Sequence, residues 1–271
     1  MLNTIVFQSV PQRHPRWVDI CMQSVRAWAS RNGASYLLIA DEEFLSRPPS
    51  WIREKSRPWI NPLTDLARLE FAGDLLEQYE FAVWADSDVL ILDQDRLALP
   101  RPEDAAFPRE LWLDYDTASG ALLKVSSISN YLCAFRRGGS FLSRYREDAL
   151  DVLRRSAEPL THDIIGTSFL TSRYNEGDIE ILSNLANFSP MVTQALLTDN
   201  TGIIAEYDKA LDEEIYGVNL CMSFLRRNFE IRIPHGDVLR LVQNLSELSG
   251  GTRVTQISRH INATSLPSRS G

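Results

Sequence analysis

The order of apolar runs in the first sixty residues restricts the fold more than any other feature. "TIVFQSV" (4–10) and "SYLLIA" (35–40) are short apolar runs of the kind that form buried strands. Between them, "RWVDICMQSVRAWASRN" repeats apolar residues every three or four positions and ends near Asn32-Gly33, which is typical of an amphipathic helix. A strand–helix–strand order predicts an α/β fold whose mixed central sheet is mainly parallel and flanked by helices.

Further elements are expected along the chain. A helix is predicted from about Thr64 to Tyr79, a strand over 129–135 and a helix near 139–155. A further strand, "EIRI", is predicted to end in "PHG" at 234–236. The stretches 44–62 and 93–127 are expected to be variable loops.

The chain is expected to form one domain over residues 1–240 and a polar C-terminal tail over 241–271. The last thirty residues are rich in Ser, Gly, Asn and Thr, which predicts a weakly ordered end.

Composition excludes several classes of function. The net charge is -8 with only three lysines, so a broad nucleic-acid-binding face is not expected. No apolar run approaches the roughly 20 residues that cross a bilayer, and the first residues do not have the pattern of a secretory signal. Three cysteines lie far apart, without a pair spaced for zinc or a disulfide framework. These features together favour a cytoplasmic protein.

The stretch "FAVWADSDVLIL" (81–92) holds the strongest chemical signal. Asp86 and Asp88 lie between two apolar runs, where two like charges repel each other and lose hydration unless a cation is nearby. The D-x-D triplets at 93–95 and 114–116 do not follow an uninterrupted apolar strand. In open α/β sheets, ligands bind beyond the carboxyl ends of strands. We therefore expect both carboxylates to share Mn²⁺ or Mg²⁺ with the oxygens of a diphosphate; the alternative is a pair of solvated carboxylates.

Several motifs, in order over residues 4–236, resemble glycosyltransferase family 32. They are "NTIVFQSVPQRHP" with "SVRAWASRNGASYLLIADEEFL", the sequence Thr64-Asp65-Leu66-Ala67-Arg68 ahead of Asp86-Ser87-Asp88, "ISNYLCAFRRGGSFLSRY" with Asn130, "GTSFLT", "NFSPM" and "IPHG". The sequence also resembles glycosyltransferase family 8, whose members likewise carry an apolar strand that ends in D-x-D. The resemblance implies the GT-A fold, a Rossmann-like fold of nucleotide-diphospho-sugar transferases.

The resemblance and the side-chain chemistry together assign expected roles. Asp86, Asp88 and Arg68 are the expected catalytic residues, and Asp86, Asp88 and His235 the expected metal ligands. Residues expected to bind the sugar nucleotide are Phe7, Gln8, Ser9, Asp65, Arg68, Trp84, Asp86 and Asn130.

For most of these residues a structural explanation stays open. Asp65 and Arg68 are three apart on a helix, so a surface ion pair worth tenths of a kcal/mol is the alternative to sugar and phosphate binding. His235 could be structural, Asn130 a turn former, and Phe7 and Trp84 ordinary core residues.

The expected activity is transfer of a sugar from a UDP- or GDP-linked donor to a hydroxyl acceptor, with retention implied by the resemblance. The acceptor could be a glycan, a lipid-linked saccharide, a natural product or a protein. One alternative is a phosphotransferase of the haloacid-dehalogenase type with Asp86 as nucleophile, although such enzymes also need a downstream lysine. Another is a non-catalytic protein that binds sugar nucleotides.

Overall fold

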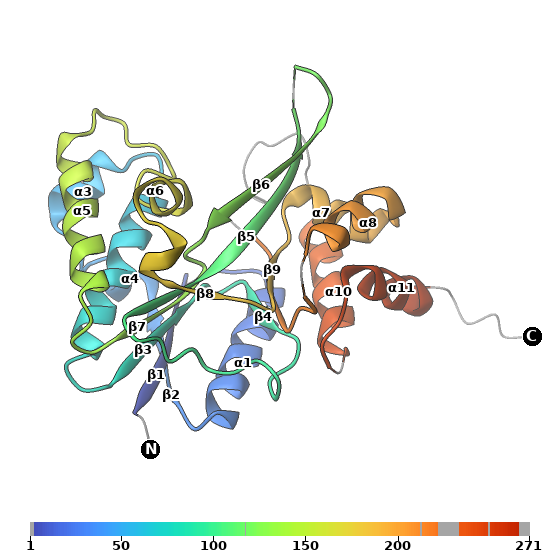
Figure 1. Cartoon of the computed structure of the whole chain (residues 1–271), viewed down its shortest axis with the longest axis horizontal. Helices are drawn as coiled ribbons and strands as arrows, with labels where there is room; N and C mark the ends of the chain where they lie inside the picture. Colours follow the sequence, from blue (N-terminus) through green and yellow to red (C-terminus); the bar gives the residue numbers. More distant parts are fainter. Residues whose placement is uncertain (1–2, 117, 212, 222–232, 249, 266–271) are drawn as a thin grey trace, which may run out of the picture.

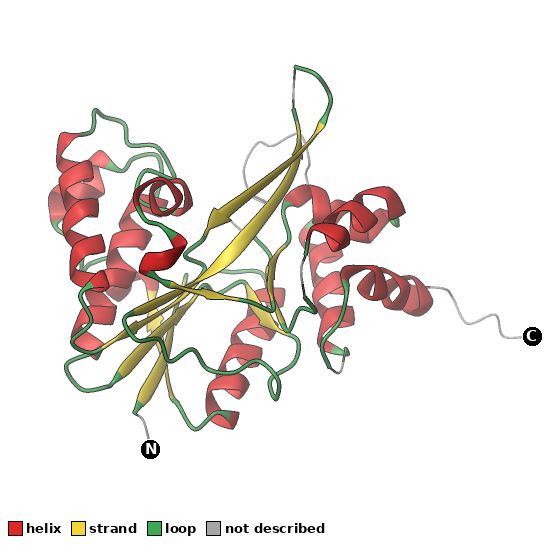
Figure 2. Ribbon diagram, in the orientation of Figure 1, coloured by secondary structure: helices red, strands yellow, loops and turns green. Residues whose placement is uncertain are grey.

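The computed structural model describes residues 3–116, 118–211, 213–221, 233–248 and 250–265. Strands and helices are interspersed along this chain, with five consecutive strands in its middle part (Figures 1 and 2). The strands are β1 (Thr4–Val10), β2 (Ser35–Ala40), β3 (Phe81–Ala85), β4 (Val89–Ile91), β5 (Ala105–Tyr115), β6 (Leu122–Ile128), β7 (Leu132–Arg136), β8 (Glu180–Leu182), β9 (Leu185–Asn187) and β10 (Gly217–Asn219). The helices are α1 (Arg16–Arg31), α2 (Asp41–Phe44), α3 (Ser50–Lys55), α4 (Asn61–Leu75), α5 (Phe141–Arg155), α6 (Thr167–Arg173), α7 (Pro190–Thr198), α8 (Thr201–Ala210), α10 (His235–Ser246) and α11 (Val254–Ser265), with a short 3-10 turn, η1 (Glu176–Asp178).

The main sheet has the order β2-β1-β3-β7-β5-β6, with β8 beside β5. β1 pairs in parallel with both β2 and β3, as the opening strand–helix–strand unit requires. β7 then runs antiparallel to β3 and β5, and β5 runs antiparallel to β6. The expected mixed α/β sheet flanked by helices is confirmed, but it is not mainly parallel. The pairs β1–β2, β1–β3 and β5–β8 are parallel, while β3–β7, β5–β7 and β5–β6 are antiparallel. For the last pair the reason is that a short turn joins β5 to β6, and strands joined in this way must run antiparallel.

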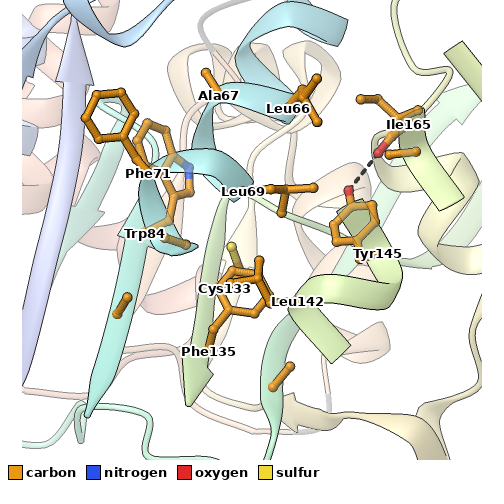
Figure 3. Packing of buried hydrophobic residues seen from close by; sticks show 14 of the residues in the cluster. Leu66, Ala67, Leu69, Phe71, Trp84, Cys133, Phe135, Leu142, Tyr145 and Ile165 are labelled. Carbon is orange, nitrogen blue, oxygen red and sulfur yellow. Dashed lines mark hydrogen bonds between the residues drawn. The ribbon is translucent and has the colours of Figure 1, made fainter. Parts of the chain in front are cut away.

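Both faces of the main sheet are buried, which explains why its central strands are continuously apolar. Ile5 and Phe7 of β1 pack on the face covered by α4 and α5, while Val6 between them packs on the face covered by α1. β3 alternates in the same way, with Trp84 on the α4 side and Val83 on the α1 side. Figure 3 shows α4 and α5 packed over Trp84 and its neighbours on β7.

A second, smaller sheet has the order β4-β10-β9 and packs in a second hydrophobic core. This core also takes apolar side chains from α1, α7, α8, α10 and α11. The prediction of a weakly ordered end is wrong for α11, because Val254, Ile257 and Ile261 of this helix are buried there. The helix α10 also runs across the expected boundary at residue 240. In both α10 and α11, apolar residues recur at helical spacing, so each helix can bury one face although the segment 241–271 is polar in composition.

Two further predictions need correction. The region 93–127 is not simply a loop, since it contains β5 and nearly all of β6, an antiparallel hairpin that extends beyond the other strands in Figure 1. The helix expected from Thr64 to Tyr79 is α4, which begins earlier and has Pro62 in its first turn, a position where proline is well tolerated. The predicted strand "EIRI" falls almost wholly outside the described residues. Within the described part of the chain, none of the helices combines the length and apolar character that crossing a membrane requires.

Candidate functional site

A cavity of about 390 Å³ lies beyond the carboxyl end of β3. Its walls come from α4, the turn after β3, the β5–β6 hairpin, and the segments 129–131, 162–168 and 219–221. It therefore gathers residues that are far apart in the sequence. Asp65, Arg68, Asp86, Asp88 and Asn130, all predicted as site residues, lie in its lining.

The two aspartates of the D-x-D triplet share this cavity because of the turn that they form. Residues 86–88 form a turn, closed by the bond from the Val89 amide to the Asp86 carbonyl at 3.1 Å, so they are not an extended strand. The turn is fixed on both sides. The Asp86 amide donates to the Tyr131 carbonyl at 2.7 Å, and the Asp88 carbonyl accepts from the Leu220 amide at 3.2 Å. Asp86 and Asp88 thus line one cavity because the turn is tied to two neighbouring segments.

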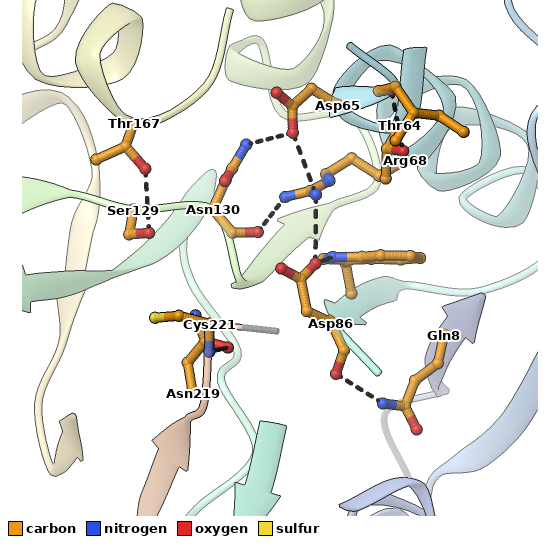
Figure 4. A network of polar contacts seen from close by, with 12 residues as sticks. Gln8, Thr64, Asp65, Arg68, Asp86, Ser129, Asn130, Thr167, Asn219 and Cys221 are labelled. Atoms are coloured by element: carbon orange, nitrogen blue, oxygen red, sulfur yellow. Dashed lines mark hydrogen bonds and ion pairs between the residues drawn. The ribbon is translucent and has the colours of Figure 1, made fainter. Parts of the chain in front are cut away.

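Arg68 lies at the centre of a buried polar network (Figure 4). Its Nη2 is 3.2 Å from Oδ1 of Asp65 and 3.3 Å from Oδ1 of Asp86, and its Nη1 donates to the Asn130 carbonyl. The Asn130 side chain closes the network by donating from Nδ2 to Oδ1 of Asp65 at 3.1 Å. Asp65 is 6% exposed and Arg68 3%, so the alternative of a surface ion pair is wrong.

Burial affects the protonation of the carboxylates in this cavity. It raises the pKa of Asp65 to about 7, although the Arg68 charge acts in the opposite direction. Burial also raises the pKa of Asp86, which Arg68 and the hydrogen bond from Trp84 lower. Burial raises the pKa of Glu110 to about 7, against the lowering effect of its hydrogen bond from Ser129. Arg68 alone thus does not compensate for the burial of these carboxyl groups, and an added cation would stabilise their ionised forms.

The remaining residues predicted to bind the nucleotide lie beside the cavity lining or in the core. Phe7 is fully buried and meets the Trp84 ring edge-on, with centroids 5.2 Å apart, which is core packing. Trp84 is also buried and donates from Nε1 to Oδ1 of Asp86 at 2.6 Å. Gln8 donates from Nε2 to the Asp86 carbonyl at 3.0 Å, and the Ser9 hydroxyl hydrogen-bonds to Asp41. These side chains hold Asp86 and the end of β1 in place.

His235 is the predicted site residue that the structure places elsewhere. It is the first residue of α10, exposed, and lines a different cavity with Arg13, His14 and Trp17. Among the described residues no group of three or more His, Cys, Asp and Glu side chains is arranged to hold a metal ion. The predicted set of Asp86, Asp88 and His235 is thus not assembled, and the two aspartates alone remain together. The sequence could not reveal this, because which cavity His235 lines depends on how α10 packs in the folded chain.

Most of the lining residues were missed by the sequence reasoning, including five with charged or aromatic side chains that bear on binding. These five are Glu110, Trp112, Asp114, His162 and Asp163. The first three alternate with leucines in "RELWLDY", a period of two that indicates a strand with one polar face. His162 and Asp163 precede Gly166, where an added Cβ would lie 2.6 Å from Oδ1 of Asp163 and 3.1 Å from Oδ2 of Asp65. Glycine is needed here because the chain passes close to two carboxylates.

No model of a protein family matches the sequence, and no curated protein matches it. Several solved glycosyltransferase structures are similar in fold. One is a glycosyltransferase involved in the glycosylation of the major capsid of PBCV-1, with 11% identity, a TM-score of 0.44, and coverage of 96% of this chain and 99% of that one. Another is the galactosyltransferase LgtC in complex with donor and acceptor sugar analogs, with 12% identity, a TM-score of 0.38, and coverage of 98% of both chains.

Proposed function

We propose that the protein is a metal-dependent glycosyltransferase that moves a hexose from a UDP- or GDP-linked donor to a hydroxyl acceptor, with retention at the anomeric carbon. One observation carries the proposal. Asp86 and Asp88, which follow the buried strand β3, line one cavity together with the buried Arg68. Carboxylates for a hard cation beside a fixed guanidinium suit a diphosphate, whose charge both groups neutralise.

The chemistry of the two aspartates fits Mn²⁺ or Mg²⁺. Such ions are commonly held by one or two carboxylates, with the remaining positions taken by substrate phosphates and water, so a third protein ligand is not required. Asp86 and Asp88 would hold the ion. When bound, it would neutralise negative charge on the diphosphate leaving group.

The side chains around Arg68 orient it. Its planar guanidinium lies 5.1 Å from the centre of the Trp84 ring, and Asp65, Asp86 and Asn130 each contact it. In the reaction the bond from the anomeric carbon to the diphosphate oxygen breaks, and a bond to the acceptor oxygen forms. The diphosphate leaves with the bonding electrons, and an oxygen of this leaving group takes up the proton that the acceptor hydroxyl loses. Arg68 would stabilise the leaving group, where negative charge grows in the transition state.

The phosphotransferase alternative finds no support in the cavity. An enzyme of that type needs a lysine near its nucleophilic aspartate, and none of the described lining residues is a lysine. Lys124 is paired with Glu206 instead. Oδ1 of Asp86 also accepts a bond from Trp84 and contacts Arg68, which lowers its reactivity as a nucleophile.

The test is a thermal-shift screen of UDP-, GDP- and CDP-sugars, each with and without Mn²⁺. We expect stabilisation by one nucleotide class, and only with the metal present, because the diphosphate and the ion complete each other's binding site. In Asp88→Ala the shift should disappear. Release of free nucleotide diphosphate should fall at least a hundredfold in the same variant.

Asp95→Ala is the matched control, because Asp95 belongs to another D-x-D triplet but is exposed and pairs with Arg31 on the surface. It should keep the full shift. If Asp88→Ala responds to sugar nucleotide and Mn²⁺ like the wild type, the proposal is wrong. Tight nucleotide binding without turnover with any acceptor would indicate a binding protein, and hydrolysis of p-nitrophenyl phosphate without sugar-nucleotide turnover would indicate a phosphatase.

A further inference from the structure

The β5–β6 hairpin forms one wall of the cavity through a single face. Glu110, Trp112 and Asp114 occupy alternate positions of β5, and Val125 and Ser127 lie opposite Trp112 and Glu110 on β6. Alternate residues of a strand point to the same face, so these five side chains form one surface. We call it the hairpin platform.

The opposite face of the hairpin has a structural role. Leu113 is fully buried in the second core, and Leu111 and Leu122 pack against that core. Leucines at every second position therefore fix the hairpin. This packing uses the opposite face, and the platform side chains line the cavity instead. Glu110 is held in place by a hydrogen bond from the Ser129 hydroxyl at 2.9 Å.

We infer that the acceptor is a neutral sugar that binds on the hairpin platform, with a pyranose ring against the indole of Trp112. This inference rests on the proposed function. A pyranose has an apolar face of C–H groups and a rim of hydroxyls. An aromatic ring covers the first, and the carboxylates of Glu110 and Asp114 accept hydrogen bonds from the second. Ligand sites that combine an aromatic surface with a few placed polar groups recognise ligands of this kind.

A second observation favours the binding of a polar ligand deep in the same cavity. Tyr131 is 1% exposed and lines the cavity, yet its hydroxyl has no hydrogen-bond partner among the described residues. An unpaired buried hydroxyl is costly, so a polar ligand that reaches it would be favoured. A sugar hydroxyl supplies such a partner, whereas an apolar aglycone does not.

The charge of the cavity predicts that the acceptor is not an anion. Among the described lining residues six carry carboxyl groups, and Arg68 is the one lysine or arginine. The carboxyl groups belong to Asp65, Asp86, Asp88, Glu110, Asp114 and Asp163. Asp86 and Asp88 would face the metal and the donor, while Glu110 and Asp114 remain on the platform. A uronic acid or a phosphorylated sugar would bring a like charge next to Asp114, and next to Glu110 whenever that carboxyl is ionised, which disfavours binding.

The inference is tested with the full-length protein, Mn²⁺ and the sugar nucleotide found in the thermal-shift screen. Methyl glucoside and methyl galactoside are each compared with the corresponding methyl uronoside, and a serine peptide and a phenol are added as acceptors. Release of nucleotide diphosphate above the rate of donor hydrolysis is measured. We expect stimulation by a neutral glycoside at least tenfold greater than by its uronoside.

Two variants and one control localise the effect. Trp112→Ala should raise the KM for the neutral acceptor at least tenfold, and the KM for the donor less than threefold. Asp114→Asn should increase the use of the uronoside relative to the neutral glycoside, a change that a merely structural role would not produce. Tyr115→Ala is the matched control, because Tyr115 is the next aromatic residue on β5, is 50% exposed and does not line the cavity. It should leave both KM values unchanged.

The inference is overturned if donor hydrolysis occurs but no neutral glycoside stimulates it. Equal or better use of uronosides, stimulation by the peptide or the phenol alone, or equal acceptor KM values in Trp112→Ala and Tyr115→Ala would overturn it as well. Absence of any sugar-nucleotide binding or turnover by the wild type is a different result, since it removes the proposed function itself.

Discussion

Arg68 is the residue on which the candidate site depends most. It is a buried cation that contacts the buried carboxylate of Asp65 and the partly exposed carboxylate of Asp86, and no other lysine or arginine is in the described cavity lining. A buried ion pair adds little net stability compared with apolar residues of the same size, but removal of one partner leaves a charge unpaired. The network thus makes Arg68 necessary for the fold as well as for the proposed chemistry.

We predict that Arg68→Met lowers the free energy of unfolding by about 3–5 kcal/mol at pH 8 and by clearly less at pH 5.5. The native pKa of Asp65 is already about 7 and that of Asp86 is raised, above the values of the unfolded chain. Carboxyl groups with raised native pKa values favour the folded state at low pH, and this contribution is lost as the pH rises through the native pKa. Without Arg68 these carboxyls take up a proton more readily at pH 5.5 than at pH 8, which reduces the cost of the missing cation at the lower pH. Urea denaturation at both pH values measures the difference.

Arg155→Met is the control for this experiment, since Arg155 forms an exposed pair with Asp151 on α5. Its loss should change stability by no more than about 0.5 kcal/mol at either pH. A loss in Arg68→Met that is equally large at both pH values, or as small as that of the control, would contradict the network described above.

At the scale of elements, the position of the β5–β6 hairpin depends on α7. Ser189 precedes this helix, is fully buried, and accepts a hydrogen bond from the Val192 amide at 3.4 Å. The same hydroxyl donates to the Leu113 carbonyl of β5 at 3.1 Å. One side chain therefore caps the helix and ties it to the strand that carries Trp112.

Ser189→Ala should lower the free energy of unfolding by about 1–2 kcal/mol, because it leaves the Val192 amide and the Leu113 carbonyl without this partner. Chemical denaturation measures the loss. Ser246→Ala serves as the control, because its exposed hydroxyl bonds only to the Gln243 carbonyl within α10. If the two variants are equally stable, Ser189 does not act as the cap described here.

At the scale of the whole molecule, the described residues form three hydrophobic cores, and two of them lie on either side of the candidate site. The first lies between the main sheet and α4 and α5, and the second between the small sheet and the helices on the right of Figure 1. The turn after β3 connects them, because β4 leaves the main sheet and pairs with β10. Asp86 and Asp88 thus lie where the two cores meet, and damage to the second core should weaken the whole protein.

Ile257→Ala in α11 tests this arrangement. Ile257 is fully buried in the second core, so the variant should lose about 2–5 kcal/mol of stability and have a lower Tm. Arg259→Ala, at an exposed position of the same helix, should remain within about 0.5 kcal/mol of the wild type. A weakly ordered C-terminal segment would instead give two variants of the same stability.

Local spacing in the sequence was enough to predict the elements that begin the fold. These elements are the strands β1, β2 and β3 and the amphipathic helix α1. The strands stand out as short apolar runs, and the helix as apolar residues three to four positions apart. The same helical spacing places Asp65 and Arg68 on one face of α4. The position of Asp86 and Asp88 at the end of a buried strand follows in the same way. These features depend on neighbours in the chain, which the sequence displays directly.

Only the tertiary structure decided what surrounds them. Arg68 meets the Asn130 carbonyl across 62 positions, and Asp65 meets the Asn130 side chain across 65. These long-range contacts make Asp65 and Arg68 part of a buried network rather than a surface ion pair. The packing of distant segments also places the hairpin platform in the cavity lining and His235 in a different cavity. The physical reason is that burial and charge depend on which distant segments pack together, and the packing of two cores is a property of the whole chain rather than of any stretch of it.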